Sequence, residues 1–140
     1  MKILLKNATI LDPSSAFHST KQDLLIKDGE IANISQDIND TDNAKVIEHN
    51  NLHVSKGWFD SGVSFGEPGY EERETLENGL LVAASSGFTK ILLNPDIIPI
   101  PDSNATISHL IKMGKNKTTS IYPIGALTEK GEGKQLASLY

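Results

Sequence analysis

The sequence contains no cysteine, and only 6% of its residues are aromatic. The lack of cysteine excludes disulfide bridges and thiolate zinc sites, and it is compatible with a reducing compartment such as the cytoplasm. No apolar run reaches the roughly 18 residues that a membrane-spanning helix needs, and the N-terminus lacks the apolar core of a signal peptide. We therefore expect a cytoplasmic protein with no membrane partner.

An excess of charge of either sign is also lacking. The formal net charge is −5 over 140 residues. The basic residues are scattered, and Lys112, Lys115 and Lys117 are expected at a solvated helix end rather than in a phosphate-binding stripe. This distribution leaves no electrostatic footprint for nucleic acid, so we expect no nucleic-acid partner. The length and the hydrophobic content of 38% suit a folded globular chain.

The first 55 residues predict a small module of β-strands. Asp28-Gly29 joins two β-like runs, and this dipeptide is typical of the type I′ turn of a hairpin. The polar pair Lys6-Asn7 separates two short apolar runs near the N-terminus. The expected strands cover residues 3–5, 9–11, 23–27, 30–34 and about 46–47, with a polar loop over 35–45.

From about residue 56 the pattern alternates between strand and helix. Apolar residues recur at i, i+4, i+7 and i+8 from Leu76, which predicts a helix over 71–86 with three glutamates in its first turn and Gly87 at its end. Asp102 or Ser103 could cap a second helix. The expected strands lie around residues 63–65, 89–93 and 119–124, and a third helix is expected over 133–140.

Residues 57–69 carry the most specific pattern, Gly-Trp-Phe-Asp-Ser-Gly-Val-Ser-Phe-Gly-Glu-Pro-Gly. This segment resembles the Gly-Phe-Ile-Asp-x-His-x-His-x-Arg-Glu-Pro-Gly signature of dihydroorotases, members of the cyclic amidohydrolase superfamily. The matching residues are Gly57, Asp60, Glu67, Pro68 and Gly69. The resemblance implies that Asp60, Glu67, Pro68 and Gly69 have a structural role around the site and take no part in the reaction.

The reactive residues of that signature are missing. Its two zinc-binding histidines fall on Gly62 and Ser64, and its substrate-binding arginine falls on Gly66. Residues i and i+2 of a strand share a face, so a His-x-His pair can place two imidazoles on one zinc ion. Glycine has no side chain, and serine offers a neutral hydroxyl that is a poor substitute for imidazole. We therefore predict no metal ligand and no catalytic residue in this chain, although the active family uses zinc.

The resemblance continues to the end of the chain. Gly87-Phe88-Thr89, followed by Pro95 and Pro99, is similar to the segment that carries the family's substrate-binding asparagine, which falls here on Asp96. A carboxylate only accepts hydrogen bonds and would repel the carboxylate of dihydroorotate. Residues 123–128 and 133–136 resemble the third-strand region, where a scaffold role is expected. The four histidines, His18, His49, His53 and His109, share no metal-ligand spacing.

The fold that the resemblance implies is α/β. It is the N-terminal part of a (β/α)₈ TIM barrel of the metal-dependent-hydrolase type, over residues 56–140, preceded by a small β-sandwich module over residues 1–55. Three βα units are fewer than half of a barrel, which typically has about 250 residues. We therefore expect a fragment of a longer chain; a self-sufficient smaller α/β domain is the alternative.

Two functional hypotheses remain. The first is a pseudoenzyme: a dihydroorotase-like protein of pyrimidine biosynthesis that acts as a structural partner of aspartate transcarbamoylase, and that is expected to form a homo-oligomer. The alternative is an active zinc-dependent cyclic amidohydrolase, in which zinc activates a water molecule and further ligands lie beyond residue 140. The replacement of two ligands at Gly62 and Ser64 favours the first hypothesis.

Overall fold

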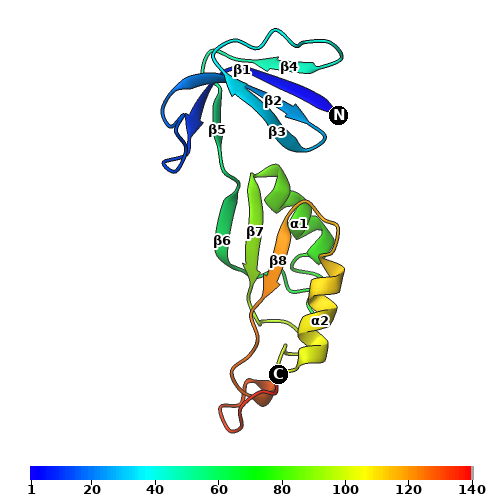
Figure 1. The fold of residues 1–140 in the computed structure, drawn as a ribbon. Helices are drawn as coiled ribbons and strands as arrows, with labels where there is room; N and C mark the ends of the chain where they lie inside the picture. The colour runs from blue at the N-terminus through cyan, green and yellow to red at the C-terminus, as the bar shows by residue number, and fades with distance from the viewer. Residues whose placement is uncertain (140) are drawn as a thin grey trace. The chain divides into compact units, whose positions relative to one another are not determined.

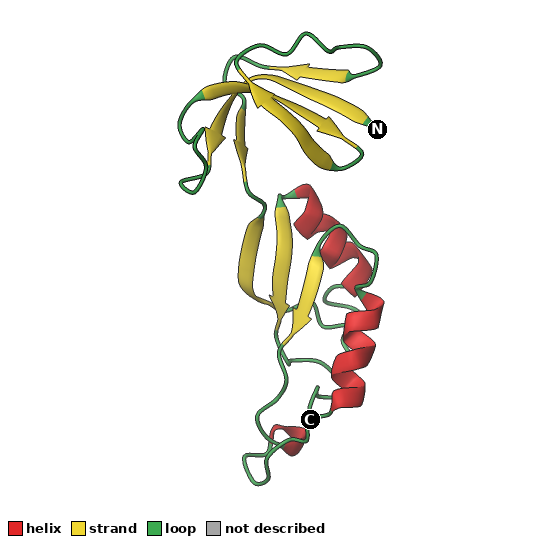
Figure 2. Cartoon of the chain, viewed as in Figure 1, coloured by secondary structure: helices red, strands yellow, loops and turns green. Residues whose placement is uncertain are grey.

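The structure is a computed structural model that describes residues 1–139, and the chain divides into two compact units, Met1–Lys56 and Gly57–Tyr140. The first unit consists of strands and loops, while the α-helices of the described residues belong to the second unit (Figure 2).

The first unit is one five-stranded sheet, and residues 1–55 alone do not show the expected sandwich module. Its main path runs β3-β2-β1-β4, and β5 also pairs with β1 (Figure 1). β2 is antiparallel to both of its neighbours, whereas β4 and β5 run parallel to β1 along the same edge. The strands are β1 (Lys2–Leu11), β2 (Lys21–Lys27), β3 (Glu30–Ser35), β4 (Lys45–Glu48) and β5 (His53–Ser55).

A buried carboxylate explains why β1 is one strand and not the expected pair of short strands. Asp23 on β2 is 1% exposed and lies opposite the irregular step in β1 between Leu5 and Ala8. Its carboxylate accepts the backbone N–H of Asn7 at 2.9 Å and forms an ion pair with Lys6. The polar pair therefore forms a bulge with internal partners, and the strand continues through it.

The same carboxylate also holds a loop against the sheet. Asp23 accepts the N–H of Ile38 at 3.0 Å. Ile38 packs against Leu4 of β1 and Leu25 of β2 in one buried cluster. Burial raises the pKa of Asp23, but the hydrogen bonds from Lys6, Asn7 and Ile38 outweigh that effect and hold the pKa below its usual value. The charged form is therefore the form that the folded unit stabilises.

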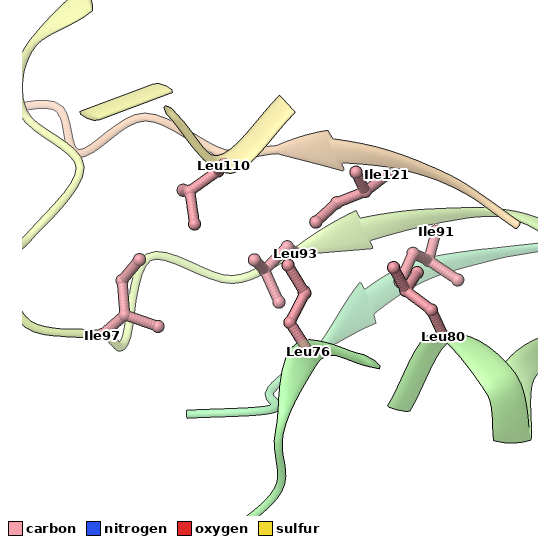
Figure 3. Packing of buried hydrophobic residues seen from close by; sticks show 7 residues of the cluster. All are labelled: Leu76, Leu80, Ile91, Leu93, Ile97, Leu110 and Ile121. Atoms are coloured by element: carbon pink, nitrogen blue, oxygen red, sulfur yellow. The ribbon is translucent and has the colours of Figure 1, made fainter. Parts of the chain in front are cut away.

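The second unit is a parallel sheet of β6 (Trp58–Val63), β7 (Phe88–Leu93) and β8 (Ser120–Pro123), in that order. Helices α1 (Leu76–Ser85) and α2 (Asn104–Met113) lie on one side of it (Figure 1). Figure 3 shows the resulting core, in which side chains of β7, β8, α1 and α2 meet. Its buried members are Leu76, Leu80, Ile91, Leu93, Ile97, Leu110 and Ile121.

The parallel pairing of these strands agrees with the expected βα units, but the three strands form an open sheet and not a closed barrel. Within residues 1–139, no helix is long and apolar enough to cross a membrane.

The expected start of the first helix is wrong. Helix α1 begins at Leu76, because Thr75 has extended backbone angles and its hydroxyl accepts the N–H of Asn78 as the N-cap. The three glutamates expected in its first turn, Glu71, Glu72 and Glu74, therefore precede the helix.

The expected helix over 133–140 is absent from its described part. A 3₁₀ turn, η1 (Glu129–Gly131), is followed by bends at residues 133–135 and by isolated β-bridges at Leu136 and Ser138, and Ala137 N–H donates to Leu127 O at 3.1 Å. Gly133, where the expected helix would begin, has a φ angle of +72°, which a right-handed helix does not use. Tyr140 lies outside the described residues.

Replacing Asp23 by asparagine is expected to lower the free energy of unfolding of the first unit by roughly 2–3 kcal/mol at pH 7, because the neutral amide loses charge-assisted hydrogen bonds. The pKa of Asp23 is lowered in the folded state. Its contribution is therefore fully present above the unfolded-state pKa of about 3.9 and is lost as pH falls through the folded-state value. Urea unfolding with hydrogen exchange of the β2 amides should show the difference between the two proteins shrinking below about pH 4. A difference that does not change with pH would contradict this assignment.

Candidate functional site

The candidate site lies where β6 and β7 end. The connection after β6 covers residues 64–75, and the connection after β7 covers residues 94–103. In parallel α/β sheets the carboxyl ends of neighbouring strands meet at one edge, and ligands bind in the crevice outside it. The residues that correspond to the dihydroorotase motif are all in or next to these connections, apart from Gly57 at the opposite end of β6.

The structure brings Gly62 and Ser64 next to a residue that the sequence analysis did not single out, Asn94. The Asn94 amide donates to Ser64 Oγ at 3.0 Å, and its backbone N–H donates to Val63 O at 2.8 Å. A Cβ atom on Gly62 would lie 3.6 Å from Asn94 Oδ1. Asn94 follows the apolar run of β7 directly, so its place beside the end of β6 could have been inferred from the parallel pairing of two adjacent strands.

These residues do not fit a zinc ion. Zinc sites in proteins use imidazole, thiolate or carboxylate ligands, and the two motif positions supply only a hydroxyl and a hydrogen atom. The nearest carboxylate in the motif, Asp60, accepts the N–H of Gly62 at 3.0 Å. Among residues 1–139, no group of three or more His, Cys, Asp or Glu side chains could hold a metal ion. The Ser64 hydroxyl accepts a hydrogen bond from an amide and has no histidine base among its partners, so it is not an activated nucleophile.

Gly66 has a backbone conformation that excludes the family's arginine. Its φ angle is +105°, and an added Cβ would lie 2.6 Å from Tyr70 O. The Gly66 carbonyl accepts the N–H of Tyr70 at 2.9 Å, which closes the turn over this position. An L-residue at 66 would therefore have both a strained φ and a backbone collision.

The retained motif residues join the two connections to each other and to α1. Glu67 accepts the N–H of Leu76, the first residue of α1, where a negative charge also favours the helix dipole. Pro68 O accepts the N–H of Ile98 at 2.9 Å. A Cβ on Gly69 would lie 2.6 Å from Ile98 Cβ, so only glycine allows this approach. These contacts are structural and need no metal.

Glu71 holds the same turn from its other end. Its carboxylate accepts the N–H of Gly69 at 2.9 Å. This hydrogen bond, together with one from the N–H of Glu71 itself, lowers the pKa of the Glu71 carboxyl.

The remaining expected positions line two pockets. Asp96 is exposed and lines a pocket of about 300 Å³ with Tyr70 and Arg73, and the sequence analysis did not single out Arg73. Asp60 and Ser64 line a separate pocket of about 330 Å³ beside α1, whose other walls are mainly apolar. The four histidines join neither pocket.

Restoring arginine at position 66 is expected to destabilise the second unit rather than to restore a substrate contact. The left-handed φ and the collision with Tyr70 O together should cost about 2–4 kcal/mol. Gly133→Arg is the matched control: its φ is +72° but nothing lies within 4 Å of an added Cβ, so only about 1 kcal/mol is expected. Trp58, the sole tryptophan, packs edge-on against Phe88 and reports unfolding of this unit by fluorescence. Equal losses in the two variants would show that Gly66 is not sterically restricted.

Comparison with known proteins finds curated relatives that are named dihydroorotase. No protein-family model matches the sequence. A dihydroorotase of Pelotomaculum thermopropionicum is 37% identical over 139 residues, which are 99% of this chain and 32% of that protein. A dihydroorotase of Bacillus cytotoxicus is 37% identical over 137 residues, 97% of this chain and 31% of that protein.

Solved structures show the same relationship at the level of the fold. An L-hydantoinase from Arthrobacter aurescens superposes with a TM-score of 0.72 at 24% identity, over 90% of this chain and 28% of its own. A dihydroorotase structure superposes with a TM-score of 0.64 at 16% identity, over 92% of this chain and 32% of its own. The chain thus spans about a third of the length of the curated relatives it matches. Over that span the chain is similar to proteins named dihydroorotase, with the imidazole and guanidinium positions of the motif replaced.

Proposed function

We propose that this chain belongs to a non-catalytic dihydroorotase-like protein of pyrimidine biosynthesis, which acts in the cytoplasm as a structural partner of aspartate transcarbamoylase. The proposal depends on which residues are present at the carboxyl end of β6 and in the connection that follows it. Gly62, Ser64 and Gly66 lack the ligating groups, while Glu67, Pro68 and Gly69 keep contacts that hold the connections together. This combination is expected of a protein that needs its folded surface for binding a partner and does not need an active site.

The arrangement around position 66 supports loss of function rather than a changed ligand set. Asn94 donates to Ser64 and lies beside the position where a side chain on Gly62 would begin. The turn over Gly66 leaves no room for a Cβ atom. Restoring the motif would therefore require changes in the surrounding backbone as well as three substitutions.

The second candidate is an active zinc-dependent cyclic amidohydrolase. The observation in its favour is the name dihydroorotase on relatives that are 37% identical to this chain. It would require metal ligands and a general base from outside residues 1–139, because two imidazole positions are missing here. We regard it as the weaker candidate for that reason.

A protein partner is supported by the sheet face opposite α1 and α2. Ile91 and Ile121 are paired neighbours that point toward the helices, so the alternate residues point the other way. On that side Phe59 is 55% exposed and Tyr122 is 47% exposed. Exposed aromatic side chains on an open sheet favour association with another surface. We assign this face to the transcarbamoylase, to a second copy of the chain or to the remainder of a longer chain.

The purified full-length protein is expected to contain no stoichiometric zinc and to leave dihydroorotate unhydrolysed, because the strand end provides no strong ligand. Elemental analysis and a turnover assay with and without a chelator provide the test. Ser64→Ala serves as the control and should change neither measurement. Stoichiometric zinc that is lost in this variant, or turnover that a chelator abolishes, would refute the inactive assignment.

Association with aspartate transcarbamoylase is expected to depend on the exposed sheet face. Tyr122→Glu should weaken co-sedimentation at least about tenfold, because it places a charge in an apolar contact. Lys115→Glu changes an exposed residue just beyond α2 and should leave association unchanged. If the unaltered chain stays monomeric and ignores the transcarbamoylase, the partner assignment is wrong while the inactive assignment stands.

A further inference from the structure

The pocket lined by Tyr70, Arg73 and Asp96 combines one cation, one anion and an apolar wall. Its volume is about 300 Å³, which is at the lower end of the range for small-molecule sites. It lies at the carboxyl ends of β6 and β7, and both connections contribute to it. Ile97, Ile98 and Ile100 supply the apolar lining.

Arg73 lines this pocket and stacks on Tyr70. Its guanidinium carbon lies 4.2 Å from the centroid of the Tyr70 ring, so the ring covers one face of the group. Stacking uses the face of a guanidinium and leaves the N–H donors along its edge available for a bidentate contact. An arginine that is already stacked also loses less side-chain entropy when a ligand binds.

The Arg73 side chain begins close to the position at which the family's arginine would begin. An added Cβ on Gly66 would lie 3.3 Å from Arg73 Cβ, so the two side chains would begin at nearly the same place. This chain has no cation at position 66, where the motif has an arginine, but it has one seven residues later, at Arg73. Its surroundings differ, because Asp96 lines the same pocket.

Asp96 does not neutralise Arg73. Within residues 1–139, no ion pair joins these two side chains, although both line the pocket. A purely anionic ligand such as dihydroorotate would meet the Asp96 carboxylate, and a purely cationic ligand would meet the guanidinium. A ligand with both charges can satisfy both groups.

The apolar wall is held in place by the retained motif. Ile98 is 53% exposed, and its N–H is bound by Pro68 O at 2.9 Å. Ile97 is 1% exposed and is part of the core with Leu93 and Leu110 (Figure 3). A small ligand could therefore cover the exposed isoleucine surface without a rearrangement of the loop.

We propose that this pocket binds an α-amino acid with an apolar side chain, with its carboxylate on Arg73, its ammonium group on Asp96 and its side chain against Ile98 and Ile100. This inference goes beyond the proposed function, because neither the lack of catalysis nor a protein partner requires a ligand here.

The test compares three probes of matched carbon skeleton on the unaltered chain: L-leucine, 4-methylpentanoate and 3-methylbutylamine. We expect L-leucine to cause saturable amide NMR shifts in residues 70–73 and 96–100. Each analogue lacks one charge-assisted contact and leaves one pocket charge unpaired, so each should bind at least about tenfold more weakly. Equal affinities for the three probes, or no saturable shift with L-leucine, would overturn the proposal.

Variants separate the roles of the two charges. Arg73→Gln should weaken L-leucine at least about tenfold. Asp96→Asn should weaken L-leucine but strengthen 4-methylpentanoate, because it removes the repelling carboxylate. Glu72→Gln changes an exposed neighbour that does not line the pocket and should alter neither affinity. Should Arg73→Gln unfold, the opposite responses of the two probes to Asp96→Asn still decide the matter; weaker binding of both would contradict the assigned roles.

Discussion

The second unit depends on a close backbone approach between its two long connections. Gly69 lies against Ile98 so closely that no Cβ fits between them, and Pro68 O accepts the Ile98 N–H next to that contact. Glu67 extends the same link to the first turn of α1. The connection after β6, the connection after β7 and the start of α1 therefore form one assembly. A change in any of the three elements would alter the position of the other two.

These contacts do not depend on a bound metal. The residues that close the turn and cap the helix stabilise the fold with or without a metal, because their partners are backbone groups of this chain. The residues that ligate a metal contribute to the fold only through that metal. In this chain Ser64 accepts a hydrogen bond from Asn94, and Gly66 has a left-handed backbone conformation. Neither feature involves a metal ligand.

The strand and helix pattern was predictable wherever hydrophobic periodicity governs it. The hairpin at Asp28-Gly29, the parallel strands β6 to β8 and the body of α1 follow from that pattern. The ends of the strands and helices were not predictable, since they depend on hydrogen-bond partners that are distant in sequence. The polar pair Lys6-Asn7 indicated a break in β1, but Asp23 supplies its partners and β1 continues. The segment after Gly133 indicated a helix, but the chain there bends, and the N–H of Ala137 donates to Leu127 O.

What this sequence determined by itself is the absence of ligating groups at Gly62, Ser64 and Gly66, because the chemistry of a side chain is a property of residue identity alone. The identity of Asp96 likewise fixes an acceptor where the motif has an amide. Only the tertiary structure decided that Gly66 is closed to larger residues, because its φ angle and the position of Tyr70 O result from the packing of the whole turn. It also decided that Arg73 and Asp96 share a pocket, since the two residues lie on different connections and meet only where parallel strands end side by side.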